Sequence, residues 1–205
     1  MLIKEIIIII LASAILGLSL AFPNTSEIFS ALIYMAIIIV VNVLAKKVWA
    51  YYYEANTEFK FWSWYHFGFR RDSHFKEPLP MFWLPLAFSL ITKGLFFWPA
   101  ILEFDITPRT ERVSRRHGLY RFTEMAETHV AEIAIAGIVA NMILAILAYI
   151  LGFATLGKLS VYYLLFSLIP LGSLDGSKIF FGSRYLWITF VVIALIFAFF
   201  AFIPA

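Results

Sequence analysis

The chain has 205 residues, of which 62% are hydrophobic and only 14% are charged. A soluble domain is about half apolar and a quarter charged, so this composition excludes a soluble globule and a disordered segment. The formal charge of +3 and the lack of cysteine argue against a specific nucleic-acid partner and a disulfide scaffold. The sequence therefore predicts an integral membrane protein that has the lipid bilayer as a partner.

Apolar runs of about 20 residues are long enough to cross a bilayer as helices. Four runs of this kind are clear, and a shorter fifth run continues through a proline. They cover residues 5–22, 27–45, 130–153 and 185–203, with the fifth at 159–172. We expect a single polytopic membrane domain over 1–205 with about five to six transmembrane helices.

Residues 79–102 are also long enough to span, but prolines, Lys93 and Gly94 interrupt the segment. A spanning helix would divide the basic residues 8 to 7 between the two sides, with Lys93 itself inside the membrane. A hairpin that enters and returns would leave 14 on one side and Lys158 alone on the other, apart from Lys93 near its turn. Because the positive-inside rule favours the second arrangement, we expect a re-entrant hairpin, with a kinked spanning helix as the alternative. The N-terminus is then cytoplasmic and Ala205 is outside.

Aromatic residues are concentrated in the predicted cytoplasmic linker 51–78. From Phe59 to Phe69 they partly alternate with polar residues, which predicts a strand at the level of the lipid headgroups. A strand pair is predicted at 101–107 and 117–122. The predicted fold is thus an all-α integral membrane protein with a small interfacial β-sheet.

Polar residues inside apolar runs are costly and therefore informative. Asn42 and Lys46 lie one helical turn apart, and Asp175 is expected at a similar depth, at the inner end of the fifth run. Asn141 lies within the run 130–153. An alternative interpretation is that Lys46 and its neighbour Lys47 are ordinary cytoplasmic anchors, and that Asp175 caps a helix.

Three segments resemble motifs of the site-2 proteases, which are intramembrane zinc metalloproteases. Ala-Gly-Ile-Val-Ala-Asn at 136–141 is similar to the family's AGPxxN segment, and Ser167 to Gly176 is similar to its NxxPxxxLDG segment. Residues 42–46 stand where the family has HExxH. The positions that match the family are Gly137, Asn141, Pro170, Asp175 and Gly176.

The resemblance covers about 30–185 and implies a protease-like core, with 5–22 and 185–203 as accessory helices. We expect a multi-pass protein of a prokaryotic plasma membrane. Ile138 and Ser167 depart from the family pattern, since they replace its proline and its asparagine.

The catalytic positions of the family are also replaced. A zinc hydrolase of this type needs two histidines one turn apart and a glutamate as general base. Asn42, Val43 and Lys46 stand at these positions, so we expect neither catalysis nor a zinc cofactor there. Instead, we expect the Lys46 ammonium within ion-pair distance of Asp175, a hydrogen bond from Asn42 nearby, and Lys47 directed toward headgroups.

The leading functional prediction is a non-catalytic site-2 protease-like protein, a pseudoprotease, that binds or scaffolds transmembrane segments of other proteins through an exposed strand edge and the cleft beside it. One alternative is an active intramembrane zinc protease with an atypical metal site formed by His129, Glu132 and Asp175, because His129 and Glu132 lie three residues apart on one helix. Another alternative is a transporter of ions or small solutes. Its polar path would be lined by Asn42, Lys46, Lys93, Asn141 and Asp175.

A group of arginines lies between the predicted strands of the second pair. We expect these residues to lie against anionic lipid, with docking to an acidic partner or to ribosomal RNA as the alternative. They are Arg109, Arg112, Arg115, Arg116 and Arg121.

Overall fold

The computed structural model describes residues 3–66, 74–109 and 125–202. This part of the chain contains four helices that are long and apolar enough to cross a membrane. They are α1 (Ile3–Ala21), α2 (Ile28–Tyr52), α5 (Glu127–Ile150) and α8 (Arg184–Phe202). These helices confirm the four clear apolar runs and agree with an integral membrane protein.

The predicted fifth span is shorter than expected. Helix α6 (Ala154–Ser167) has 14 residues, which rise about 21 Å and do not cover a bilayer core of about 30 Å. The chain then turns through Pro170, and α7 (Asp175–Gly182) begins after the extended residue Leu174. Residues 159–172 are therefore a short helix and a turn rather than one spanning helix.

Residues 79–102 do not form a continuous helix either. Helix α3 (Leu84–Ile91) is only 8 residues long, and Lys93 and Gly94 form a turn with φ of 54° and 83°. From there the chain returns without helical structure to β4 (Leu102–Pro108). The kinked spanning helix is thus wrong, whereas the entry of this segment into a bilayer stays a prediction.

The β-structure consists of two antiparallel pairs. Strand β1 (Ala55–Phe61) pairs with β4, and β2 (Ser63–His66) pairs with β3 (His74–Pro80). The predicted strand 59–69 is interrupted at Trp62, because the Trp62 N–H donates to Ile101 while its carbonyl accepts from Met81, so this residue connects the two pairs. The strand predicted at 101–107 is confirmed, and β1 is its observed partner, whereas 117–122 lies outside the described residues.

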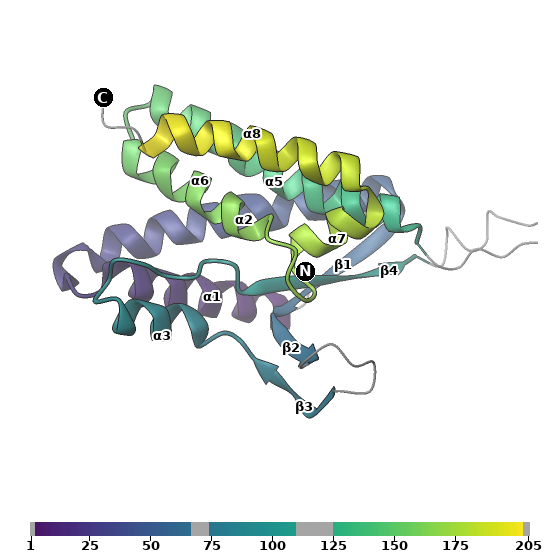
Figure 1. The fold of residues 1–205 in the computed structure, drawn as a ribbon, viewed down its shortest axis with the longest axis horizontal. Helices are drawn as coiled ribbons and strands as arrows, with labels where there is room; N and C mark the ends of the chain where they lie inside the picture. Colours follow the sequence, from purple (N-terminus) through teal and green to yellow (C-terminus); the bar gives the residue numbers. More distant parts are fainter. Residues whose placement is uncertain (1–2, 67–73, 110–124, 203–205) are drawn as a thin grey trace, which may run out of the picture.

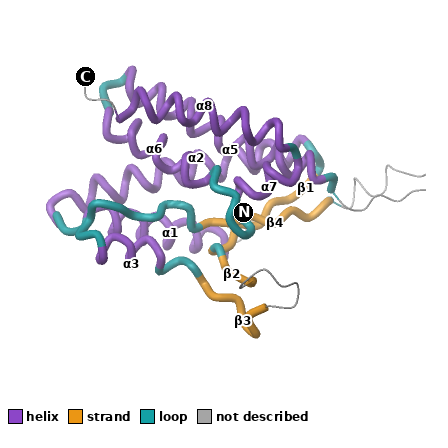
Figure 2. Tube along the Cα trace, in the orientation of Figure 1, coloured by secondary structure: helices purple, strands orange, loops and turns teal. Residues whose placement is uncertain are grey.

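The helices pack in the order α3, α1, α2, α5, with α6, α7 and α8 beyond α5, as Figure 1 shows. A 3₁₀ turn, η1 (Thr25–Glu27), precedes α2. The strands gather at one end of the molecule, beside α7, and we call this the strand end (Figure 2). Helix α1 begins at the strand end, and α8 ends at the opposite end (Figure 1).

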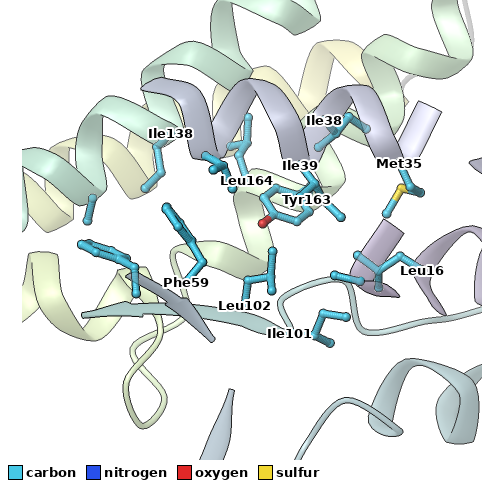
Figure 3. Close-up of a cluster of buried hydrophobic side chains, with 14 of the residues drawn as sticks. Leu16, Met35, Ile38, Ile39, Phe59, Ile101, Leu102, Ile138, Tyr163 and Leu164 are labelled. Atoms are coloured by element: carbon cyan, nitrogen blue, oxygen red, sulfur yellow. The ribbon is translucent and has the colours of Figure 1, made fainter. Parts of the chain in front are cut away.

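One cluster of buried side chains joins the helices to the β1–β4 pair. Phe59 and Leu102 come from the two strands, and they meet Leu164 of α6 and Ile138 of α5 (Figure 3). Side chains at alternate positions of β1 are buried, which places one face of the pair on this core. The core thus fixes the strand pair beneath the strand end of α2, where the candidate site lies.

Candidate functional site

The site is centred on a buried ion pair between α2 and α7. The Lys46 Nζ lies 2.6 Å from the Asp175 Oδ2, and the two residues are only 3% and 4% exposed. Asp175 is the first residue of α7, where the unpaired N–H groups of the helix start also favour a negative charge. These are the two residues that the sequence predicts to pair, although 129 positions separate them.

A second lysine, which the sequence analysis missed, lies at the same place. The Lys178 Nζ is 3.6 Å from the centre of the Phe104 ring and donates a hydrogen bond to the Phe104 carbonyl, and the Lys46 Nζ is 4.9 Å from the same ring centre. Burial lowers the pKa of Lys178 to about 8, against the opposite influence of the Asp175 charge. The spacing of three residues from Asp175 on one helix was the signal that could have indicated Lys178.

Gly137 of α5 provides the space for this pair. A Cβ at this position would lie 2.6 Å from the Lys46 Cε and 2.8 Å from the Asn42 Nδ2, both closer than ordinary contacts. A larger residue would therefore force the side chains of Asn42 and Lys46 on the facing side of α2 to move. Gly176 is similarly confined, because a Cβ there would meet the Leu168 carbonyl.

We expect Gly137→Val to lower the free energy of unfolding by about 1–3 kcal/mol, because the added Cβ and its two methyl groups would overpack the contact with Lys46. Ala140→Val is the matched control, since Ala140 lines an open groove on the same helix and should tolerate the change. Unfolding monitored by circular dichroism in detergent measures both variants. Equal stability of the two would contradict this role of Gly137.

Asn42 and Val43, which replace catalytic positions of the family, are buried, and so is the matching position Asn141, whereas Pro170 is exposed. Val43 is 1% exposed and belongs to the hydrophobic core. Asn42 is 1% exposed, and its Nδ2 has no hydrogen-bond partner in the described part of the chain, so the predicted hydrogen bond from this amide is not formed. The amide of Asn141 likewise has no partner among the described residues, while its backbone carbonyl accepts from Ser160 at 2.8 Å.

His129 and Glu132 are engaged with Tyr53 rather than with Asp175. The Tyr53 hydroxyl donates to the Glu132 carboxylate, and its ring stacks on the His129 imidazole at 4.6 Å. The hydrogen bond to Glu132 is the main cause that raises the pKa of Tyr53 to about 12. Within residues 3–66, 74–109 and 125–202, no three His, Asp or Glu side chains form a group that could hold a metal ion, so the predicted ligand set is not assembled.

Lys47 pairs with a carboxylate of α1, a contact that the sequence analysis missed, and its orientation toward lipid headgroups stays a prediction. Its Nζ lies 3.0 Å from the Glu5 Oε1 and donates to the Thr57 carbonyl at 3.1 Å. Glu5 is 5% exposed in the packed surface of α1, so its carboxylate needs a cation close by. Lys47 thus ties α2 to both α1 and β1.

Two residues of the polar path that the transporter alternative predicts lie far apart. Lys93 lies in the turn next to Gly94, whose Cβ position faces the Phe22 carbonyl just beyond the end of α1. This is the end of α1 opposite to the strand end, where Lys46 lies (Figure 1). The two lysines are therefore separated by most of the length of the helices.

Lysines also contact both outer edges of the β1–β4 pair. Trp62 and Arg109 donate backbone hydrogen bonds across the pair at its two ends. Because such bonds alternate along an antiparallel pair, the backbone groups of Thr57 and Phe104 point outward, away from the partner strand.

The outward carbonyl of Thr57 accepts from Lys47, and that of Phe104 accepts from Lys178. A peptide that added to either edge as a further strand would have to displace a lysine. One outward carbonyl on each edge of the β1–β4 pair is thus occupied by a lysine.

Arg109 is the one arginine of the predicted lipid-binding group that the structure describes. Its Nε donates to the Asn56 Oδ1 at 2.8 Å, and its guanidinium carbon lies 4.7 Å from the centre of the Tyr51 ring. The other four members of the group lie outside the described residues: Arg112, Arg115, Arg116 and Arg121.

The centre of the site is a buried carboxylate paired with one lysine, with a second lysine nearby. A buried ion pair of this kind holds two helices in one register, because moving either partner would leave an unpaired buried charge.

Comparison of the chain with protein-family models, curated proteins and solved structures found no match.

Proposed function

We propose that this chain is a non-catalytic relative of the site-2 proteases in which an ion pair takes the place of the metal centre. The observation that carries the proposal is the 2.6 Å contact between Lys46 and Asp175. In the resemblance, these positions correspond to the second histidine and to the aspartate ligand. Gly137, from the segment similar to AGPxxN, packs against the same lysine and supports the correspondence.

The function we propose is to bind a transmembrane helix of another protein. A groove of about 570 Å³ between α2, α5 and α8 supports this, because its walls are almost entirely apolar. Ala45, Ala136 and Ala140 lie in the groove, and small residues let the backbones of two membrane helices approach closely. The groove is adjacent to the ion pair, since Ala45 precedes Lys46 and Ala136 precedes Gly137 in the chain.

Helix binding is favoured over strand addition for a structural reason. Strand addition needs free backbone groups along an edge, and lysines occupy the central outward carbonyls of the β1–β4 pair. A partner helix in the groove satisfies its own backbone hydrogen bonds and displaces only lipid.

The test uses the full chain in lipid vesicles with a fluorescent single-span peptide that carries a face of small residues. We expect energy transfer between labelled protein and peptide, and an affinity about tenfold lower for Ala140→Leu, which fills the groove. Ile33→Leu is the matched control, because Ile33 lies on the exposed surface of α2 outside the groove. Equal affinity of the two variants would overturn the groove as the binding site.

The same vesicles test whether the protein is catalytic. We expect the peptide to stay intact over the course of the measurement, with and without a zinc chelator. Cleavage that the chelator abolishes would overturn the proposal and support the active protease.

A further inference from the structure

A polar pocket of about 480 Å³ lies at the strand end, where α1, α2 and β1 meet Arg109, the residue that directly follows β4. It is distinct from the Lys46–Asp175 pair and from the apolar groove. Charges of both signs line it, from Lys47, Arg109, Glu5 and Glu58. A pocket of mixed charge at one end of a membrane helix bundle suits a ligand that carries both charges.

The positive side of the pocket is built around Arg109. Asn56 accepts from its Nε at 2.8 Å, and the ring of Tyr51 lies 4.7 Å from the guanidinium carbon. A guanidinium held in this way loses little conformational freedom when it binds a phosphate, whose oxygens match its paired N–H groups. Arg109 forms no ion pair in the described part of the chain.

The negative side of the pocket selects the rest of the ligand. Glu5 and Lys47 already neutralise each other at 3.0 Å. This leaves Arg109 and Glu58 as the charged lining residues that form no ion pair within residues 3–66, 74–109 and 125–202. One free cation and one free carboxylate match a zwitterion.

An apolar strip on α2 adjoins the pocket and suits the acyl chains of a lipid. Val40, Leu44, Lys47 and Tyr51 follow one another at helical spacing and therefore share one face of α2. Val40 is 40% exposed and Leu44 is 50% exposed, so an apolar strip leads from the pocket toward the middle of the helix. Tyr51, at 67% exposure, is the kind of aromatic residue that membrane proteins place at the level of the headgroups.

We propose that this pocket binds the headgroup of a phospholipid with an ethanolamine group. The phosphate contacts Arg109, the primary ammonium donates to Glu58, and the acyl chains lie along Val40 and Leu44. A choline headgroup has no N–H to donate to the carboxylate, and a glycerol headgroup brings no cation. Ethanolamine lipids are therefore preferred over both.

The experiment is a titration of the purified full chain in detergent with lipids of identical acyl chains, followed by native mass spectrometry. We expect the dissociation constant for phosphatidylethanolamine to be at least about tenfold lower than for phosphatidylcholine or phosphatidylglycerol. Glycerophosphoethanolamine, which lacks acyl chains, separates the contribution of the headgroup and should bind weakly. Tighter binding of phosphatidylglycerol, or equal binding of all three lipids, would overturn the proposal.

Variants identify the contacts. Arg109→Ala should weaken the binding of all three lipids, because the phosphate that Arg109 contacts is common to them. Glu58→Gln should make ethanolamine and choline lipids bind equally, because only the contact with the ammonium is lost. Lys60→Ala is the matched control: it removes a charge from the same strand, but Lys60 pairs with Asp105 and does not line the pocket. Unchanged affinities in Arg109→Ala, or an unchanged lipid preference in Glu58→Gln, would likewise contradict the proposed site.

Discussion

Replacing Asp175 by leucine should lower the free energy of unfolding by about 3–5 kcal/mol, because it leaves the buried ammonium of Lys46 without its counter-ion. Lys178 adds a second positive charge at the same place, so the variant would bury two neighbouring cations. Lys46→Met should cost less, since Lys178 remains beside Asp175 and can neutralise part of its charge. The predicted difference in stability between the two single variants therefore follows from Lys178, the third charged residue at the site.

The double variant Lys46→Met with Asp175→Leu should be close to the native stability, because neither buried charge is left and the side-chain volumes are similar. The native protein, the two single variants and the double variant form a double-mutant cycle. Chemical unfolding of these four proteins in mixed micelles gives the coupling free energy between the two residues. Additive losses in the double variant would show that the two residues do not stabilise the fold through each other.

The triple variant Asn42→His, Val43→Glu and Lys46→His should bind about one zinc ion per chain. The two imidazoles would lie one turn apart on the face of α2 that contacts Asp175. The Lys46 ammonium is already 2.6 Å from the Asp175 carboxylate, so a histidine on this turn brings a ring nitrogen into the same region. Asp175 would supply the third ligand and water the fourth.

Metal analysis after dialysis against buffer treated with chelating resin measures the zinc content. The matched control carries the same three substitutions together with Asp175→Leu and should retain far less zinc. Retention of zinc by this control would show that Asp175 is not a ligand, and loss of zinc from both would show that α2 and α7 do not present a metal-binding geometry.

The sequence was sufficient for features that depend on one segment at a time. The four long helices follow from apolar runs, because hydrophobic length is a local property. The pairing of Lys46 with Asp175 was predictable for a different reason. A lysine on the face of α2 and an aspartate at the start of a helix were brought together by the order of the motifs, and a buried carboxylate needs a cation.

Other features that depend on two distant segments were missed. Lys47 was assigned to the headgroups because its helical position gives no sign of Glu5, which lies on another helix. The hydrogen bond from Tyr53 to Glu132 was missed for the same reason, because the two residues lie far apart in the sequence. The interruption of the strand at Trp62 also has a tertiary cause, since its N–H and its carbonyl bond to different strands. Such contacts arise from tertiary packing, which the local sequence pattern does not indicate.

The lysine contacts along the β1–β4 pair have a consequence for the behaviour of the protein in a crowded membrane. Open strand edges are templates for aggregation between copies of a chain, and lysines beside an edge are a common protection against it. A hydrogen bond to a carbonyl needs only an N–H, which a neutral amine retains as well as an ammonium. Lys178 can therefore shield its edge on either side of its titration, so resistance to polymerisation through β-pairing should persist through mildly alkaline conditions.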